Sequence, residues 1–204
     1  MPQNGLFSLK CYDYGNYCYR RFISCVPMLT DLLKEIVTAL EQEGIPYMIS
    51  GSVAMNCYTI PRMTRDIDIV IELDKHSLAS FMSIFGSNFY IHKPTLDEEI
   101  ERTGMFNVID HRSGYKIDFV VRKNTVYRFL EFKRRVRIEV MGFSAWLVTA
   151  EDLIISKLIW IQDVQSEKQM DDIKNLLESG DLDIVYIVSW IEQLNLKTFD
   201  LLPK

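Results

Sequence analysis

The run DIDIVI at residues 66–71 constrains this chain more than any other stretch of its sequence. Side chains alternate between the two faces of a β-strand, so the isoleucines would be buried on one face while Asp66 and Asp68 share the other. Two carboxylates about 7 Å apart repel by roughly 2 kcal/mol at an effective dielectric constant near 20. A cation between them would remove that cost, and Mg²⁺ prefers hard oxygen ligands of this kind. The run therefore predicts one edge of a metal site.

A third carboxylate has a similar setting, since Asp118 is flanked by apolar residues in the strand predicted over 115–121. If this strand lies beside the first, the three carboxylates could hold two divalent ions for in-line displacement at phosphorus. The alternative is that Asp66 caps a strand, Asp68 faces solvent and Asp118 belongs to an edge strand. Each residue alone favours that alternative, but the three together with a nearby Gly-Ser turn favour the metal site.

The Gly-Ser turn comes shortly before the first two carboxylates. Gly51 permits a close approach of the backbone to a ligand, and the Ser52 hydroxyl and the N–H groups that open the next short helix could cradle phosphate oxygens. A Gly-Ser pair alone indicates little. One that follows a strand and precedes Asp-x-Asp on the next strand favours a phosphate site.

The apolar patterns predict an α+β fold with a mixed β-sheet, helices packed on it and a C-terminal helical unit. Residues 1–26 show no clean period and form an unassigned extension, residues 27–148 form the α/β domain, and residues 149–204 form the helical unit. Thr30 is the expected N-cap of the first helix, and Thr149 is expected to open the helical unit through a capping box with Asp152. Helices are predicted over 30–43, 53–58, 77–85, 150–164, 167–178 and 182–194, and strands over 47–49, 67–73, 89–92, 105–110, 115–121 and 136–141.

Composition narrows the classes of protein. The formal net charge of −5 argues against a protein that coats nucleic acid, although the basic run at residues 133–137 could form a local patch or a solvated edge. No apolar run reaches the length of a membrane span and no secretory signal is evident, so a cytoplasmic protein without membrane contact is expected. The spacing of the four cysteines favours free thiols over a zinc site; they are Cys11, Cys18, Cys25 and Cys57.

Several of these residues together resemble the signature of the DNA polymerase beta-type nucleotidyltransferase superfamily. The motif comprises Gly51-Ser52, Arg62, Thr64 and Asp66-Ile67-Asp68-Ile69, with Asp118 in the place of the third metal carboxylate. Within the superfamily the chain is most similar to the stand-alone bacterial proteins that include the AbiEii-type toxins, whose later helix with a lysine is matched by residues 151–158. The resemblance spans roughly residues 30–180.

The resemblance implies a mixed sheet of the polymerase-beta-like type and an enzyme that transfers a nucleoside monophosphate from an NTP to a hydroxyl group. It implies two Mg²⁺ ions bound by Asp66, Asp68 and Asp118, with Asp118 also deprotonating or orienting the acceptor hydroxyl. It implies that Ser52 binds the triphosphate. The implied acceptor is RNA, such as tRNA, or a protein, and the toxin-type relatives imply an antitoxin partner.

Basic residues around the motif could bind the nucleotide. Lys157 lies in an almost entirely apolar helix, where a lysine needs a partner, and either a phosphate or Asp172 on the following helix would serve. Arg62 and Arg65 flank the acidic strand and could neutralise phosphate, or they could be solvated loop residues. The nucleotide-binding candidates are therefore Gly51, Ser52, Arg62, Arg65 and Lys157.

Two hypotheses of different classes follow. The first is a Mg²⁺-dependent nucleotidyltransferase, with a possible role as the toxin of a toxin–antitoxin pair. The alternative is a non-catalytic nucleotide-binding or partner-binding protein on the same fold. A glycosyltransferase that binds its metal through Asp-x-Asp is a weaker interpretation, because such enzymes need a larger nucleotide-sugar domain before the motif than this chain has.

Overall fold

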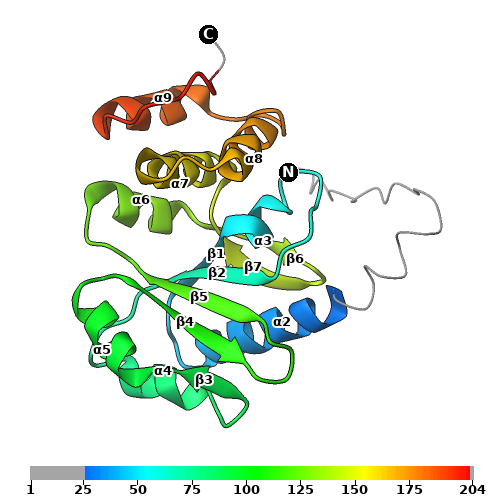
Figure 1. Cartoon of the computed structure of the whole chain (residues 1–204), viewed down its shortest axis with the longest axis vertical. Coiled ribbons are helices and arrows are strands. Elements are labelled where there is room, and N and C mark those ends of the chain that lie inside the picture. Colours follow the sequence, from blue (N-terminus) through cyan, green and yellow to red (C-terminus); the bar gives the residue numbers. More distant parts are fainter. Residues whose placement is uncertain (1–25, 203–204) are drawn as a thin grey trace, which may run out of the picture.

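The computed structural model describes residues 26–202, so the extension expected over residues 1–26 lies outside it except for Val26. Figure 1 shows the sheet in the middle of the molecule and the helices α7, α8 and α9 stacked at one end. In chain order the elements are α2 (Val26–Gln42), β1 (Tyr47–Ser50), α3 (Gly51–Met55), β2 (Asp66–Ile71), α4 (Leu78–Ile84), β3 (Phe89–Ile91), α5 (Lys93–Glu101), β4 (Met105–Asp110), β5 (Lys116–Val121), α6 (Val126–Arg134), β6 (Val136–Val140), β7 (Phe143–Leu147), α7 (Ala150–Asp163), α8 (Glu167–Leu177) and α9 (Ile184–Gln193).

The described strands form one seven-stranded sheet in the order β3-β4-β5-β2-β1-β7-β6. The pairs β2/β5 and β1/β7 are parallel, and the other neighbours are antiparallel. The turn over residues 111–114 joins β4 to β5 as the sequence predicts, with Gly114 at a positive φ of 73°. This mixed sheet with helices packed on it confirms the α+β prediction.

One face of the central strands is buried in the core. Ile67, Ile69 and Ile71 of β2 have no exposed surface, and neither does Phe119 of β5. The Phe119 ring lies edge-on to Phe81 of α4, with 5.2 Å between the ring centroids. Because side chains alternate along a strand, burial of this face turns Asp66, Asp68 and Asp118 to the opposite face of the sheet.

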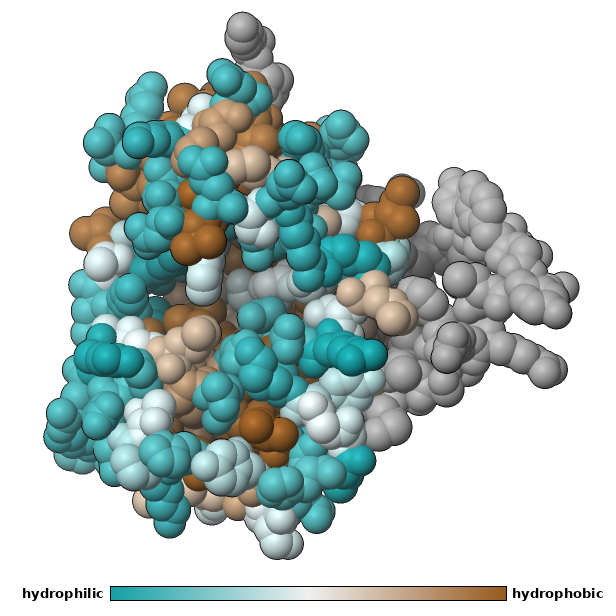
Figure 2. Space-filling model, in the orientation of Figure 1, coloured by the Kyte–Doolittle hydropathy of each residue, from teal (hydrophilic) through white to brown (hydrophobic). Residues whose placement is uncertain are grey.

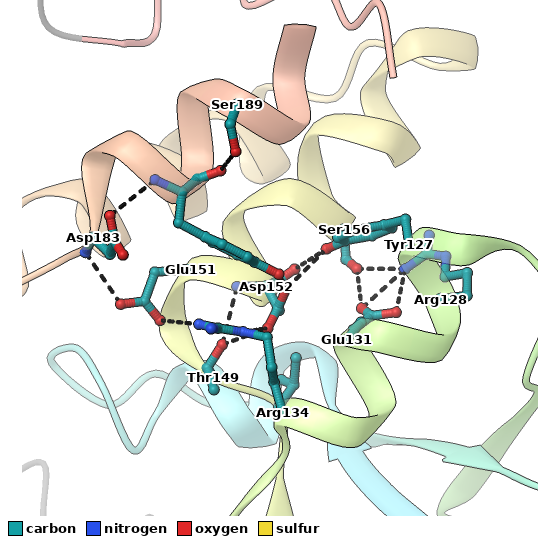
Figure 3. A network of polar contacts seen from close by, with 12 residues as sticks. Tyr127, Arg128, Glu131, Arg134, Thr149, Glu151, Asp152, Ser156, Asp183 and Ser189 are labelled. Atoms are coloured by element: carbon teal, nitrogen blue, oxygen red, sulfur yellow. Dashed lines mark hydrogen bonds and ion pairs between the residues drawn. The ribbon is translucent and has the colours of Figure 1, made fainter. Parts of the chain in front are cut away.

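Two buried carboxylates connect the C-terminal helices to α6 (Figure 3). Asp152 of α7 accepts hydrogen bonds from Arg134 Nε at 3.0 Å and from the Tyr186 hydroxyl at 2.7 Å, which joins α6, α7 and α9. Glu131 of α6 accepts from Arg128 at 2.8 Å and from the Ser156 hydroxyl. Buried charges require such partners, so these contacts hold the helices in one arrangement.

The structure differs from the predicted elements at several positions. α2 begins at Val26, so Thr30 lies inside the helix and the prediction that it is the N-cap is wrong. The Thr149 cap is confirmed, because its hydroxyl accepts a hydrogen bond from the Asp152 N–H at 3.2 Å.

The sequence did not predict α5, α6 or β7. In α6 the buried face carries Glu131, which interrupts the apolar periodicity.

No helix within residues 26–202 is long and apolar enough to cross a membrane.

The core predicts a large loss of stability for Phe119→Ala. The substitution removes a fully buried ring that packs against Phe81 and Phe106, and it should lower the free energy of unfolding by about 3–5 kcal/mol in a urea titration. Phe129→Ala is the control, because that ring is 55% exposed and should cost less than about 1 kcal/mol. Equal losses for the two variants would contradict this description of the core.

Candidate active site

The parallel pairing of β2 with β5 brings the predicted carboxylates together. Asp68 is directly opposite Asp118, and Asp66 is opposite Lys116. Residues two apart on a strand share a face, so all four side chains lie on the same side of the sheet. Asp66 is exposed, Asp68 is partly buried and Asp118 is only 7% exposed.

The electrostatics of Asp68 reflect this crowding. Burial raises the pKa of the Asp68 carboxyl, and the charges of Asp118 and Asp66 raise it further. A hydrogen bond from the backbone N–H of Ser52 and the charge of Lys157 partly offset these effects. The carboxylates therefore need positive charge before all of them can be ionised together.

Within residues 26–202 no three acidic, cysteine or histidine side chains are arranged closely enough to hold a metal ion as they stand. Lys116 Nζ instead donates to Asp118 Oδ2 at 2.6 Å. The other oxygen of this carboxylate, Oδ1, is buried and has no hydrogen-bond partner among the described residues. An unpartnered buried carboxylate oxygen beside two further carboxylates is the type of ligand that Mg²⁺ prefers, so these residues fit the metal.

The Gly-Ser turn lies directly beside Asp68. β1 ends at Ser50 and α3 begins at Gly51, two residues before the predicted start of this helix. Gly51 has a φ of 59°, and a Cβ atom at this position would lie 1.9 Å from Asp68 Oδ2. Glycine is therefore required here by its backbone conformation and by the close approach of the carboxylate.

A cluster of charged side chains joins this turn to the helical unit. Arg62 donates from Nη2 to the Ser52 hydroxyl at 2.8 Å and forms two hydrogen bonds with Asp172, at 3.1 and 2.9 Å. Lys157 Nζ donates to Asp172 Oδ2 at 2.8 Å and to Gln169 Oε1 at 2.8 Å. Asp172 thus holds two cations next to the turn that is expected to bind phosphate.

Burial and pairing act in opposite directions in this cluster. Burial lowers the pKa of the Lys157 ammonium, although Asp172 raises it. Burial alone would raise the pKa of the Asp172 carboxyl, but hydrogen bonds from Arg62 and Lys157 more than offset this and lower it. The sequence predicts either Asp172 or a phosphate as the partner of Lys157. In the structure Asp172 is that partner.

Two candidates behave differently from the rest. Arg65 is exposed and makes no hydrogen bond or ion pair within the described part of the chain, so it does not join the Arg62 cluster. Lys116 was not among the candidates. The strand period could have identified it, because a residue two positions before Asp118 must share its face.

Two of the four basic residues in the run proposed as a nucleic-acid patch are paired with acids of this chain. Arg134 pairs with buried Asp152 at 3.0 Å, and Arg137 pairs with Glu41 at 3.2 Å. The Arg135 guanidinium lies against the rings of Phe132 and Trp146, 4.2 and 5.0 Å from their centroids. The pairing of Arg134 and Arg137 reduces the positive charge that the run offers to a nucleic-acid backbone, and Lys133 is an exposed member of the run.

A cavity of about 790 Å³ lies away from the carboxylates, at the other end of β2 and β5. Its lining includes Glu72 and Arg122, which form an ion pair at 2.7 Å. On the face viewed in Figure 2, the surface is hollowed between α6 and the strands beneath it. Because none of its lining residues belongs to the carboxylate site, the cavity adds no group to that site.

Gly51→Ala should destabilise the protein more than Gly44→Ala does. Both glycines have a positive φ, 59° and 67°, but a Cβ atom at Gly44 would meet nothing within 4 Å. Each substitution should cost about 1–2 kcal/mol from the left-handed backbone, and displacement of Asp68 adds to the cost at Gly51 only. Urea titrations measure both costs, and a Gly44→Ala cost equal to or above that of Gly51→Ala would refute the close contact.

Asp172→Asn should lower the stability by about 3 kcal/mol at neutral pH, because it leaves two buried or half-buried cations without an anion. The pKa of Asp172 is lower in the folded than in the unfolded protein, so this stabilisation is present above the ordinary pKa of an aspartate. It should vanish as the pH falls through the lowered folded value.

Asp171→Asn is the matched control for that prediction. Asp171 is exposed and pairs with Lys174 at 3.4 Å, so the substitution should cost less than about 0.5 kcal/mol. Urea titrations of the wild type and both variants from neutral to acidic pH measure the difference. A loss for Asp172→Asn that is independent of pH would contradict the ion-pair explanation.

Comparisons with known proteins support the fold. No protein-family model matches this chain, and no curated protein matches its sequence. The solution structure of the antibiotic-resistance factor ANT(2'')-Ia matches with 13% identity and a TM-score of 0.53, over 83% of this chain and 94% of that chain. The crystal structure of ANT(2'')-Ia in complex with adenylyl-2''-tobramycin matches with 13% identity and a TM-score of 0.54, over 82% and 99% of the two chains. This chain therefore has the polymerase-beta-like fold of nucleotidyltransferases.

Proposed function

We propose that this protein is a Mg²⁺-dependent nucleotidyltransferase that moves a nucleoside monophosphate from an NTP to a hydroxyl group of RNA or protein. The observation that supports this most is the register of β2 and β5, which sets Asp68 opposite Asp118 with Asp66 on the same face. The Ser52 N–H at Asp68 supports it further, because a phosphate-binding turn is needed beside such carboxylates. ANT(2'')-Ia, which shares the fold, is found in complex with adenylyl-2''-tobramycin, a product of the corresponding kind.

Each side chain has a role in this proposal. Asp66, Asp68 and Asp118 would bind two Mg²⁺ ions, which when bound neutralise the carboxylates and the triphosphate. The acceptor oxygen attacks the α-phosphorus, the bond to the β-phosphate breaks, and pyrophosphate leaves. Asp118 would also accept the proton of the acceptor hydroxyl or orient it.

The cluster around Asp172 would bind the triphosphate. Ser52 offers its hydroxyl, to which Arg62 already donates. Lys157 lies within electrostatic range of Asp68 and would bring positive charge to the phosphates next to it. The side chain of Arg65 is exposed and would have to move toward the site before it could contact the triphosphate or the acceptor.

The pairing of Arg134 and Arg137 with acids of this chain favours a protein hydroxyl over RNA as the acceptor. A polyanion gains most of its affinity from unpaired positive charge. Arg134 and Arg137 are paired with acids of this chain, and the net charge is −5. The resemblance to AbiEii-type proteins supports extending the proposal to the toxin of a toxin–antitoxin pair.

Incubation with α-phosphate-labelled NTPs and Mg²⁺, separately with tRNA and with cellular proteins, tests this proposal. The wild type should transfer label to one acceptor class. Asp68→Asn should reduce transfer by at least about 100-fold, because it removes a proposed ligand of the metal. Asp31→Asn, an exposed residue on α2, is the control and should retain activity.

Equal transfer by Asp68→Asn and the wild type would refute the proposal. If no label is transferred, calorimetry with NTP and Mg²⁺ shows whether the protein still binds the nucleotide. Binding without labelled product would support the alternative of a non-catalytic nucleotide-binding protein on the same fold.

A further inference from the structure

Lys116 is the cation nearest to the buried member of the carboxylate group. It lies on β5 two residues before Asp118 and opposite Asp66, and its Nζ donates to Asp118 Oδ2 at 2.6 Å. The hydrogen bond to Asp118 raises the pKa of Lys116, and the charges of Asp66 and Asp68 raise it further. The ammonium is therefore within electrostatic range of all three carboxylates.

The two oxygens of Asp118 are in different situations. Oδ2 is bound by Lys116, whereas Oδ1 is buried without a hydrogen-bond partner in residues 26–202. The side chain of Asp118 is 10% exposed. Native proteins pair nearly all buried polar atoms, so the unpartnered Oδ1 of Asp118 indicates a position that a ligand would satisfy.

Lys116 is able to leave this position. Its side chain is 42% exposed, and a lysine has a flexible four-carbon stem with one compact charge. Lys157 differs, because its side chain is only 6% exposed and is held by Asp172 and Gln169. Of these two lysines, Lys116 can move into solvent without breaking a buried ion-pair cluster.

We propose that Lys116 is an internal cation that competes with a divalent metal for Asp118, and that the metal displaces it when it binds the three carboxylates. The proposal rests on the metal site of the proposed function. A divalent ion carries twice the charge of the ammonium and can be coordinated by oxygens of several carboxylates at once. Oxygens of the triphosphate would add to the ligands of the metal and would attract the released ammonium, so the metal and the nucleotide would bind together.

Mn²⁺ binding to the full chain, measured by electron paramagnetic resonance with and without a non-hydrolysable NTP analogue, tests this inference. Lys116→Met keeps the length of the side chain and removes its charge, and it should bind Mn²⁺ alone about tenfold more tightly than the wild type. Lys116→Gln is a second variant in case Lys116→Met does not fold, which thermal unfolding reports. Lys34→Met, at an exposed position on α2, is the matched control and should leave the affinity unchanged.

A double-mutant cycle with Asp118→Asn identifies the contact that is responsible. In the Asp118→Asn background, loss of Lys116 should raise the Mn²⁺ affinity less than it does in the wild-type background, because the ion pair is already gone. The wild type should also gain more Mn²⁺ affinity from the nucleotide analogue than Lys116→Met gains.

Two results would overturn the inference, and they differ from each other. If Lys116→Met and the wild type bind Mn²⁺ equally, or the variant binds it more weakly, Lys116 is not a competitor although the metal site stands. If no protein binds Mn²⁺ with or without the analogue, the metal site of the proposed function fails and the inference fails with it.

Discussion

The register between β2 and β5 is the constraint on which the candidate site depends. A shift of this parallel pair by one residue would turn one strand over, and Asp118 would then point into the core while Phe119 faced solvent. The buried ring of Phe119 and the buried isoleucines of β2 prevent that shift. The same apolar residues that stabilise the sheet therefore hold like charges next to each other, at a cost that a cation must offset.

The site joins the sheet to the helical stack through a small number of ionic contacts. Asp172 of α8 holds Arg62 from the loop before β2 and Lys157 from α7, and Arg62 reaches the Ser52 hydroxyl. The buried Asp152 and Glu131 fix α7 against α6 in a similar way. Removal of one partner from such a contact leaves an unpaired buried charge, so the position of the phosphate-binding groups depends on helices distant in sequence.

Much of this arrangement could be predicted from the sequence, because it follows from local periodicity. The alternation in DIDIVI fixed the common face of Asp66 and Asp68, and the turn at residues 111–114 predicted the β4/β5 hairpin. The position of Asp118 beside Asp68 further depends on the parallel pairing of β5 with β2 and on its register, which the alternation within each strand does not determine. The capping residue Thr149 likewise acts within its own helix.

Other features could not be predicted, because they depend on contacts between distant residues. The bidentate pair of Arg62 with Asp172 joins residues that are 110 positions apart. The internal use of Arg134 and Arg137 is likewise set by tertiary contacts, so the basic run looked like a free surface in the sequence. α6 was missed because Glu131 on its buried face is stabilised by Arg128 and Ser156 instead of by apolar packing.

The central claim is that three carboxylates and the Gly51-Ser52 turn together bind a divalent metal and a triphosphate. Anomalous X-ray diffraction from crystals grown with Mn²⁺ and a non-hydrolysable NTP analogue tests it most directly. The account predicts anomalous peaks roughly 2.1–2.2 Å from oxygens of Asp66, Asp68 and Asp118, with phosphate oxygens at Ser52. Mn²⁺ bound elsewhere, with Lys116 still paired to Asp118 and the phosphates away from Ser52, would contradict it.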